Sequence, residues 1–344
     1  MKITVIGEVN HGKTSLVESL LGKKLLKSRA EIKDLRTRDL QVEDIVLNDK
    51  VYYLLDCPGH NSYLNNSILP IPYSDLILIL FSAVQGTVPE KILSLLQYCK
   101  YHELKILLVV TKVDLCTRDI FIKRITKIIA LLATAGITNY QYCIFSTKRP
   151  SLRELVLNKI KKISQSDTLT NKNKNTLVLR SFSRNNPGDS VEDYKTGILG
   201  CLPSENLELG QYYLNQDSST IPIKITKIIN PSNNSTGYVT CDTNLSGCYS
   251  AFNRLKGAVV SKIPLERNCR VTLIVDKFIA LNSKIKNKQC YVVIGFSIYH
   301  IEVTHINKNT YQATIPLLSE SKFLMLEKNQ KIWSLLAFGR ITKK

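Results

Sequence analysis

The chain has 344 residues, 44% of them hydrophobic, which excludes a largely disordered protein and suits two or three domains. No apolar run is long enough to cross a bilayer, and the start at Met1 lacks the features of a secretory signal. Nine cysteines are scattered singly without a C-x-x-C pair, which argues against a disulfide framework and against a zinc cage. We therefore expect a cytoplasmic or equivalent reducing compartment and no membrane partner.

Charge is the strongest compositional signal. The chain carries 47 Lys and Arg against 28 Asp and Glu, a formal net charge of +19. Such a surplus suits a polyanionic partner such as a nucleic acid. Composition alone supports equally a bias toward lysine in which these side chains are simply a solvated surface.

Strands and helices alternate over the first 160 residues. We predict strands at 2–7, 51–59, 75–83, 105–114 and 141–148, and helices at 13–22, 89–104 and 118–136, with Gly22 as a helix C-cap. This alternation predicts a parallel-rich sheet with helices on both faces. Nucleotide belongs at the carboxyl ends of the strands in such a fold.

A polar segment without periodicity follows, and then the chain changes to short strands with frequent turns. We predict these strands at 176–183, 210–216, 221–229, 235–243, 258–263, 270–278, 289–297, 311–317 and 330–341. The pattern is typical of β-barrels and is long enough for two. The expected domains are 1–165 (α/β), 177–263 and 264–344 (barrels), with a linker at 166–176.

The stretch "GEVNHGKT" matches the phosphate-binding pattern G-x-x-x-x-G-K-[ST] between a strand and a helix. Its backbone N–H groups and the positive end of the helix would surround the phosphates. Lys13 would reach the β- and γ-phosphates, and the Thr14 hydroxyl would bind Mg²⁺. The expected nucleotide-binding residues here are Glu8, Val9, Asn10, His11, Gly12, Lys13, Thr14 and Ser15.

A second motif, "LLDCPGH", follows another strand. Asp56 can order the Mg²⁺ shell through water, and the Gly59 N–H can meet a γ-phosphate. His60 could orient the attacking water, although it also fits an ordinary exposed loop histidine. We therefore predict that Lys13, Gly59 and His60 take part in catalysis.

Two further strand ends point to guanine. In "TKVD", the Asp114 carboxylate can accept from both N1–H and the exocyclic amine of guanine, and the stem of Lys112 can lie over the ring. A backbone N–H near Thr147 in "FSTK" would point at the guanine O6. The expected base-binding residues are Thr111, Lys112, Asp114, Ser146, Thr147 and Lys148.

These four motifs in this order resemble those of the translational GTPases, such as elongation factor Tu. Beyond the linker, "LRSFSRNNPGDSVEDYKTGILG" resembles the second domain of the gamma subunit of eukaryotic and archaeal translation initiation factor two. The C-terminal stretch "FLMLEKNQKIWSLLAFGRITKK" resembles the end of that family's third domain. The resemblance implies an α/β P-loop GTPase domain followed by two β-barrel domains.

The resemblance also implies function. GTP or GDP with Mg²⁺ would be the cofactors, and slow intrinsic hydrolysis would release initiator methionyl-tRNA at the small ribosomal subunit. Alpha and beta subunits of the same factor, a GTPase-activating protein and an exchange factor would be partners. Arg180, Phe182 and Gly200 would line the tRNA cleft, although Phe182 also fits the barrel core.

Three departures from the family pattern carry expectations. Thr111 stands where the family has Asn, and it has no amide to brace the phosphate loop, so we expect weaker nucleotide binding. The interval before Cys57 contains no cysteine, so no zinc is expected. Thr37 is the best match to the Mg²⁺-binding switch threonine, and an ordinary exposed loop threonine is the alternative.

Two other functions remain open at this point. One is an elongation or selenocysteine-type carrier of aminoacyl-tRNA, which tRNA selectivity would separate from an initiation factor. The other is a tRNA-binding scaffold that does not hydrolyse GTP, because its "TKVD" motif and switch region are altered.

Overall fold

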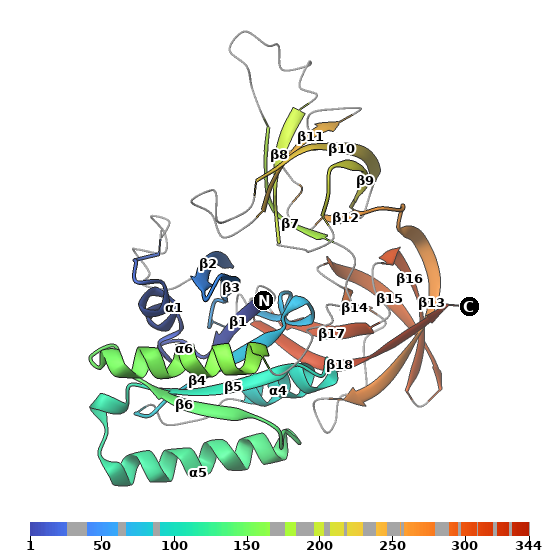
Figure 1. The fold of residues 1–344 in the computed structure, drawn as a ribbon. Helices are drawn as coiled ribbons and strands as arrows, with labels where there is room; N and C mark the ends of the chain where they lie inside the picture. Colours follow the sequence, from blue (N-terminus) through green and yellow to red (C-terminus); the bar gives the residue numbers. More distant parts are fainter. Residues whose placement is uncertain are drawn as a thin grey trace. The chain divides into compact units, whose positions relative to one another are not determined.

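A computed structural model describes the chain over residues 1–25, 40–60, 67–84, 90–165, 176–183, 196–202, 207–216, 219–229, 239–245, 255, 258–278, 289–294, 297–307, 309–318, 322–329 and 332–343. The chain divides into two compact units, residues 1–171 with 329–333 and residues 172–328 with 334–344 (Figure 1). Among the described helices, none is long and apolar enough to cross a membrane. The domain boundaries expected from the sequence stay predictions.

The first unit is built on a six-stranded sheet of order β2-β3-β1-β4-β5-β6. Its strands are β1 (Lys2–Gly7), β2 (Gln41–Leu47), β3 (Lys50–Asp56), β4 (Leu76–Ser82), β5 (Lys105–Thr111) and β6 (Gln141–Phe145). All neighbours are parallel except β2, which runs antiparallel to β3 at the edge. The predicted parallel-rich sheet is confirmed, and β2 is an addition to it.

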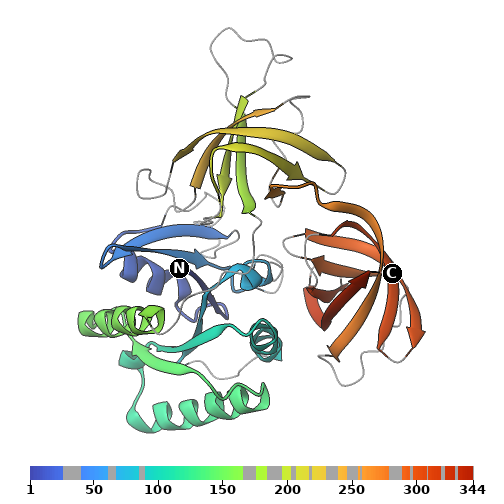
Figure 2. The ribbon, with the colours of Figure 1, turned by 45° about the vertical axis from the view of Figure 1, so that its right-hand side comes forward.

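Helices cover both faces of this sheet. They are α1 (Lys13–Leu21), α4 (Glu90–Tyr101), α5 (Arg118–Thr134) and α6 (Pro150–Gln165), with short 3-10 turns η2 (Ile71–Tyr73) and η3 (Val113–Leu115). Apolar residues of α1 and α6 share one core with alternate residues of the strands. The helix α4 contacts α5, and Figure 2 shows α4 on the other side of the sheet from α6.

The helix α1 ends as its sequence predicts. Gly22 adopts a left-handed conformation with φ 71°, which glycine reaches without steric cost, and its N–H donates to the carbonyl of Glu18. The cap fixes where α1 stops. Its first turn begins at Lys13, directly after the phosphate-binding loop.

The second unit contains two closed six-stranded barrels. The first has the order β10-β11-β8-β7-β12-β9 and consists of β7 (Thr176–Ser183), β8 (Thr196–Cys201), β9 (Gly210–Asn215), β10 (Thr220–Ile229), β11 (Val239–Leu245) and β12 (Val259–Ser261). The second has the order β13-β16-β15-β14-β17-β18 and consists of β13 (Glu266–Phe278), β14 (Gln289–Ile294), β15 (Ser297–Asn307), β16 (Thr310–Leu318), β17 (Lys322–Asn329) and β18 (Ile332–Lys343). Each barrel encloses its own apolar core. The predicted pair of barrels is confirmed.

Candidate functional site

Five parallel strands bring the sequence motifs to one edge of the sheet. The register pairs Val5 with Asp56, and Ser82 with Thr111. Thr111 in turn pairs with Phe145 at the end of β6. Because the carboxyl ends of parallel strands meet at the same edge, the phosphate, magnesium and base motifs lie together, as the sequence predicts.

The phosphate-binding loop connects β1 to α1. Two of its residues, Asn10 (φ 64°) and Gly12 (φ 82°), have left-handed backbone conformations that turn the chain around the expected phosphate position. The first turn of α1 contains no acidic residue, and no side chain caps its N-terminus. Its backbone N–H groups and the positive end of the helix dipole therefore face the loop in a form suited to an anion.

Lys13 is the buried cation of this loop. Its side chain is 7% exposed, and its ammonium group donates a 2.8 Å hydrogen bond to the Glu8 carbonyl. Burial lowers the pKa of Lys13, while the nearby Asp56 carboxylate opposes that shift. The negative charge of a phosphate group would also raise the pKa of Lys13, so the charge environment fits a bound anion.

Gly59 approaches the phosphate loop so closely that only glycine fits. A Cβ on Gly59 would overlap the Lys13 ammonium and lie 2.8 Å from the Val9 backbone nitrogen. The residue predicted to contact a γ-phosphate is therefore beside the residue predicted to bind the β- and γ-phosphates. This tight approach is an observation that favours a nucleotide cradle at this place.

The two residues predicted to serve Mg²⁺ are in contact. The Thr14 hydroxyl donates a 2.7 Å hydrogen bond to a carboxylate oxygen of Asp56. Both are hard oxygen ligands of the kind that Mg²⁺ prefers, and both lie at the phosphate loop. The residues present therefore fit Mg²⁺ beside a nucleotide. Thr37, the third predicted ligand, lies outside the described residues.

His60 follows Gly59 at the limit of the described segment and is half-buried. Its predicted contact with the attacking water stays a prediction. Within the described part of the chain, no group of three or more His, Cys, Asp or Glu side chains is placed to hold a metal ion. The expected absence of zinc also stays a prediction.

The base-binding residues lie at the ends of β5 and β6. Ser146 donates a side-chain hydrogen bond that lowers the pKa of Asp114, and Lys148 adds an ion pair at 3.8 Å. The carboxylate is thus kept ionised as an acceptor, the form that pairs with guanine. Lys112 has a left-handed backbone (φ 60°), and Ser146 accepts from the Lys148 backbone N–H at 3.1 Å. Thr147 stands between them in the same turn.

The expectation that Thr111 leaves the phosphate loop unbraced is wrong. Its hydroxyl donates a 2.8 Å hydrogen bond to the His11 carbonyl and lies 3.3 Å from the Phe81 carbonyl. Thr111 is buried at the end of β5, directly behind the loop, so a short side chain reaches where a longer amide was thought necessary. This hydrogen bond removes one reason for expecting weaker nucleotide binding.

The carbonyls of Leu80, Phe81 and Ser82, at the end of β4, accept hydrogen bonds from His11, Thr111 and Arg124 respectively. The sequence did not predict these contacts. The imidazole of His11 bonds the Leu80 carbonyl at 3.0 Å through Nδ1, and Arg124 donates from Nε to the Ser82 carbonyl at 3.1 Å. Burial, opposed by the Leu80 bond, lowers the pKa of His11 to about 4, so its ring is neutral at pH 7. The available signal was that Arg124 lies on the buried stripe of α5, one turn before Ile128.

The residues predicted to contact tRNA lie on two paired strands of the first barrel. Arg180 of β7 is exposed and pairs with Gly200 of β8, while Phe182 pairs with Ile198. The Phe182 side chain lies outside the described atoms. The structure thus brings the three positions together on one sheet surface, and their role in RNA binding stays a prediction.

A family model described as "Elongation factor Tu GTP binding domain" matches residues 1–197, more than half of the chain. Among curated proteins, translation initiation factor IF-2 of Alkaliphilus oremlandii is 30% identical over 112 residues, covering 33% of this chain and 15% of that protein. The selenocysteine-specific elongation factor of Haemophilus influenzae is 31% identical over 116 residues, covering 33% and 18%. The chain thus spans less than a fifth of the length of these two relatives.

Solved structures share the whole fold. A bacterial selenocysteine-specific elongation factor, EF-Sec, has a TM-score of 0.81 at 20% identity and covers all of this chain and 58% of that one. The elongation factor SelB of Methanococcus maripaludis, bound to the GTP analogue GPPNHP, has a TM-score of 0.77 at 14% identity, covering 100% and 79%. At these identities the likeness shows the arrangement of an α/β domain and two barrels.

Proposed function

The chain belongs to the family of the elongation factor Tu GTP binding domain, and we propose that it is a GTP-dependent carrier of aminoacylated tRNA in translation. As a member of this family it is a GTPase that binds GTP or GDP with Mg²⁺. The observation that carries the proposal is the joint placement of Lys13, Thr14, Asp56 and Asp114 at one sheet edge, in a chain that continues into two β-barrels.

Each site residue has a role in the proposed reaction. Lys13 and the N–H groups of the loop bind the phosphates, and Gly59 contacts the γ-phosphate, which GTP has and GDP lacks. Thr14, Asp56 and Thr37 would hold Mg²⁺, which would offset the negative charge that develops on the phosphate oxygens. His60 orients the water that attacks in line. Hydrolysis is slow without an activating partner, because the sequence has no arginine in a recognisable cis position.

Guanine selection rests on Asp114, Lys112 and the turn 146–148. The ionised Asp114 accepts from N1–H and the exocyclic amine, a donor pair that adenine does not have. Ser146 and Lys148, which follow β6, both contact this carboxylate, so the end of β6 helps to position the residue that binds the base.

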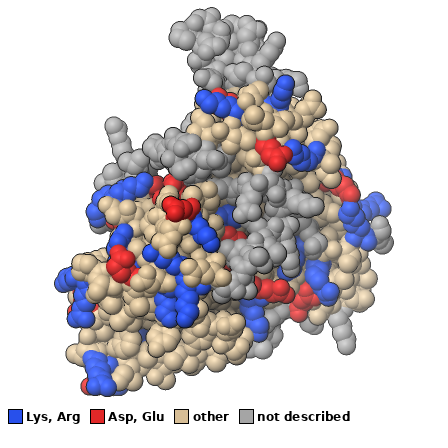
Figure 3. Space-filling model, in the orientation of Figure 1, with Lys and Arg blue, Asp and Glu red and all other residues tan. Residues whose placement is uncertain are grey.

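Initiator methionyl-tRNA is the cargo that we propose, delivered to the small ribosomal subunit by a complex with alpha and beta subunits. The support is the resemblance of residues 179–200 and 323–344 to the gamma subunit of initiation factor two. The net charge of +19 suits an RNA cargo, and Figure 3 shows Lys and Arg side chains gathered over α6. The scattered cysteines support a cytoplasmic or equivalent reducing compartment.

A selenocysteine-type carrier is the second candidate. It is favoured by the 31% identity with a selenocysteine-specific elongation factor over 116 residues. The two candidates differ in the tRNA that they carry, so a competition experiment separates them. Labelled initiator methionyl-tRNA is bound to the protein with a GTP analogue, and unlabelled elongator methionyl-tRNA or selenocysteinyl-tRNA is then added.

Displacement by neither competitor supports the initiation function. Displacement by selenocysteinyl-tRNA at equal concentration supports the second candidate. A third possibility, the scaffold that does not hydrolyse GTP, is tested by single-turnover hydrolysis with ribosomes present. Complete retention of GTP over hours would overturn the GTPase role proposed for His60 and Gly59.

A further inference from the structure

The last two turns of α6, residues 158–165, carry a cluster of cations. This α6 lysine cluster consists of Lys159, Lys161 and Lys162, and the two turns contain no acidic residue. The one carboxylate of the helix, Glu154, lies in an earlier turn and pairs with Arg153 at 2.6 Å. The positive charge that Figure 3 shows over α6 is therefore greatest, residue for residue, at the C-terminal end of the helix.

No acidic side chain balances the α6 lysine cluster. Residues three and four positions apart are neighbours on a helix, and such neighbours of the three lysines include no Asp or Glu. Among the ion pairs of the described residues, none involves these lysines. Lys159 and Lys162 are instead three positions apart and repel each other. An anion bound beside them would offset this repulsion.

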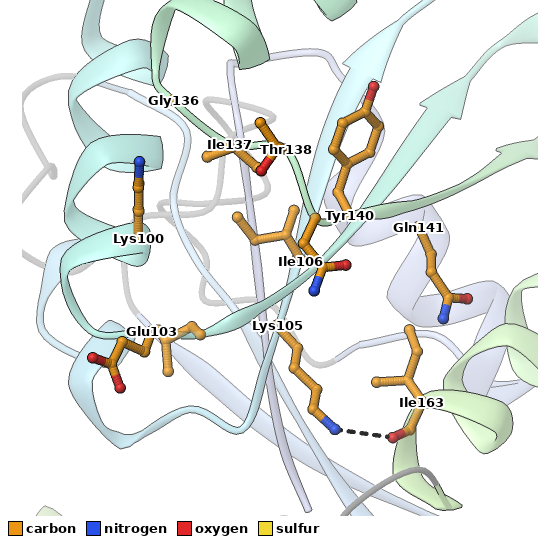
Figure 4. Close-up of a pocket in the computed structure, with 12 residues that line it drawn as sticks. Lys100, Glu103, Lys105, Ile106, Gly136, Ile137, Thr138, Tyr140, Gln141 and Ile163 are labelled. Carbon is orange, nitrogen blue, oxygen red and sulfur yellow. Dashed lines mark hydrogen bonds between the residues drawn. The ribbon is translucent and has the colours of Figure 1, made fainter.

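The helix end that carries the cluster is fixed to the sheet. Ile160 and Ile163 are buried beneath it. A 2.8 Å hydrogen bond joins the hydroxyl of Ser164 to that of Tyr52 in β3. Figure 4 shows the Lys105 side chain, from the start of β5, donating a 3.4 Å hydrogen bond to the Ile163 carbonyl. The backbone of the cluster is thus held in place before a partner binds, so binding needs only the lysine side chains to be ordered.

The surface of this helix end suits a nucleic acid better than a protein. Its side chains that are not buried are all polar, namely those of Asn158, the three lysines, Ser164 and Gln165. Protein interfaces are depleted in lysine and depend on aromatic and other large anchors, and residues 158–165 expose none. Lysines without acidic neighbours are suited to contact phosphates and to release their counterions.

The same residues distinguish between forms of RNA. Single-stranded RNA is commonly bound through aromatic side chains on which its bases stack, and residues 158–165 include no aromatic residue. Double-stranded RNA is recognised mostly by its shape and through contacts with its phosphates and sugars. A cationic helix surface without aromatic residues therefore favours the double-stranded form.

We propose that the α6 lysine cluster binds the phosphate backbone of double-stranded RNA. The lysines contact phosphates and not bases, so binding is independent of sequence and weakens steeply as salt is added. The site is distinct from Arg180, Phe182 and Gly200, the positions expected to contact tRNA, which belong to the first barrel. It also uses no residue of the nucleotide site.

A double variant with a matched control tests this site. A labelled RNA duplex of about 20 base pairs is titrated with the full chain, with GDP and Mg²⁺ bound, at several salt concentrations. One variant combines Lys159→Gln with Lys162→Gln, and the control combines Lys123→Gln with Lys127→Gln on the exposed side of α5. We expect the α6 variant to bind about tenfold more weakly, with a slope of log K against log salt that is shallower by about two. The control should behave as the wild type.

The proposal is overturned if the wild-type protein does not bind the duplex, or if the two double variants bind it alike. Polyglutamate serves as a second ligand that represents an acidic protein. Tighter binding of polyglutamate than of the duplex, lost only in the α6 variant, would assign the cluster to an acidic protein and overturn the RNA site.

A parallel titration with initiator methionyl-tRNA separates this proposal from the proposed function. The α6 variant should keep the response of tRNA binding to the GTP analogue, because its nucleotide site and its barrels are unchanged. If the wild-type protein shows no such response, the tRNA carrier function fails. The difference between the two double variants on the duplex still tests the α6 lysine cluster in that case.

Discussion

The Thr111 hydroxyl lies 2.8 Å from the His11 carbonyl oxygen and donates a hydrogen bond to it. This single bond joins the end of β5, which leads into the guanine-binding segment, to the phosphate-binding loop. The His11 ring in turn bonds the Leu80 carbonyl of β4. Two buried hydrogen bonds therefore link β4, the phosphate-binding loop and the strand end that precedes the guanine-binding residues.

Thr111→Val keeps the shape of the side chain and removes this bond. The His11 carbonyl then loses its partner, which we expect to cost about 1–3 kcal/mol in stability and to weaken GDP binding about tenfold. Chemical unfolding and fluorescent GDP titration measure both effects. Thr126→Val, which removes an exposed hydroxyl bonded to Ile122 within α5, is the matched control and should change neither. Equal behaviour of the two variants would show that the brace has no energetic role.

His11 predicts a pH dependence of stability. Its pKa is about 4 in the folded protein against 6.5 unfolded, because burial disfavours the charged ring. The unfolded state therefore binds the proton between these values, and the free energy of unfolding falls as the pH drops from about 6.5 to 4, by up to about 3 kcal/mol. His11→Asn can still donate to Leu80, so urea unfolding at several pH values should show a smaller loss in this variant. Parallel curves would contradict the assignment.

Asp114→Asn tests the base. The carboxylate accepts two donors from guanine, and an amide in its place loses one acceptor and presents a donor instead. We expect GDP affinity to fall at least about tenfold while xanthosine diphosphate, which carries a carbonyl in place of the amine, gains affinity. Asp119→Asn, an exposed carboxylate at the start of α5, should leave both affinities unchanged. Unaltered GDP binding in Asp114→Asn would place the base elsewhere.

Removal of Mg²⁺ tests the Thr14–Asp56 pair. In the wild-type protein, EDTA should speed the release of a fluorescent GDP several-fold, because the metal binds both the protein oxygens and the phosphates. Thr14→Val removes the hydroxyl that contacts Asp56, so its GDP release should already be fast and respond little to EDTA. Thr134→Val, which removes an exposed hydroxyl bonded to the Ala130 carbonyl within α5, serves as the control. A normal EDTA response in Thr14→Val would exclude the threonine as a ligand.

The parts of this fold that the sequence predicted are those with strong local patterns. The sequence predicts β4 and the Gly22 cap directly. A strand buried on both faces appears as an unbroken apolar run, and a left-handed helix cap favours glycine. Strand β2 was missed because Gln41–Leu47 is a half-buried edge strand whose polar residues interrupt the alternation. Helix α6, although periodic, was also missed, as were the barrel strands β8, β15 and β17.

Long-range contacts of the site could not be read in the same way. The motif "TKVD" predicts what Asp114 does, because its chemistry is local to the side chain and the base. That Thr111 reaches a carbonyl 100 residues earlier depends on how closely β5 passes behind the loop. The buried Arg124 likewise acts on Ser82, and no pattern in the sequence identifies which carbonyl a buried arginine will bond.

Equilibrium binding of labelled initiator methionyl-tRNA tests most directly whether this protein is a tRNA carrier controlled by its nucleotide. Binding to the purified protein is measured with a GTP analogue, with GDP and without nucleotide, with uncharged tRNA as the control. We expect the GTP analogue to strengthen binding several-fold and only the charged tRNA to respond. Tight binding that is indifferent to the nucleotide would contradict it, because the basic surface alone would then hold the RNA.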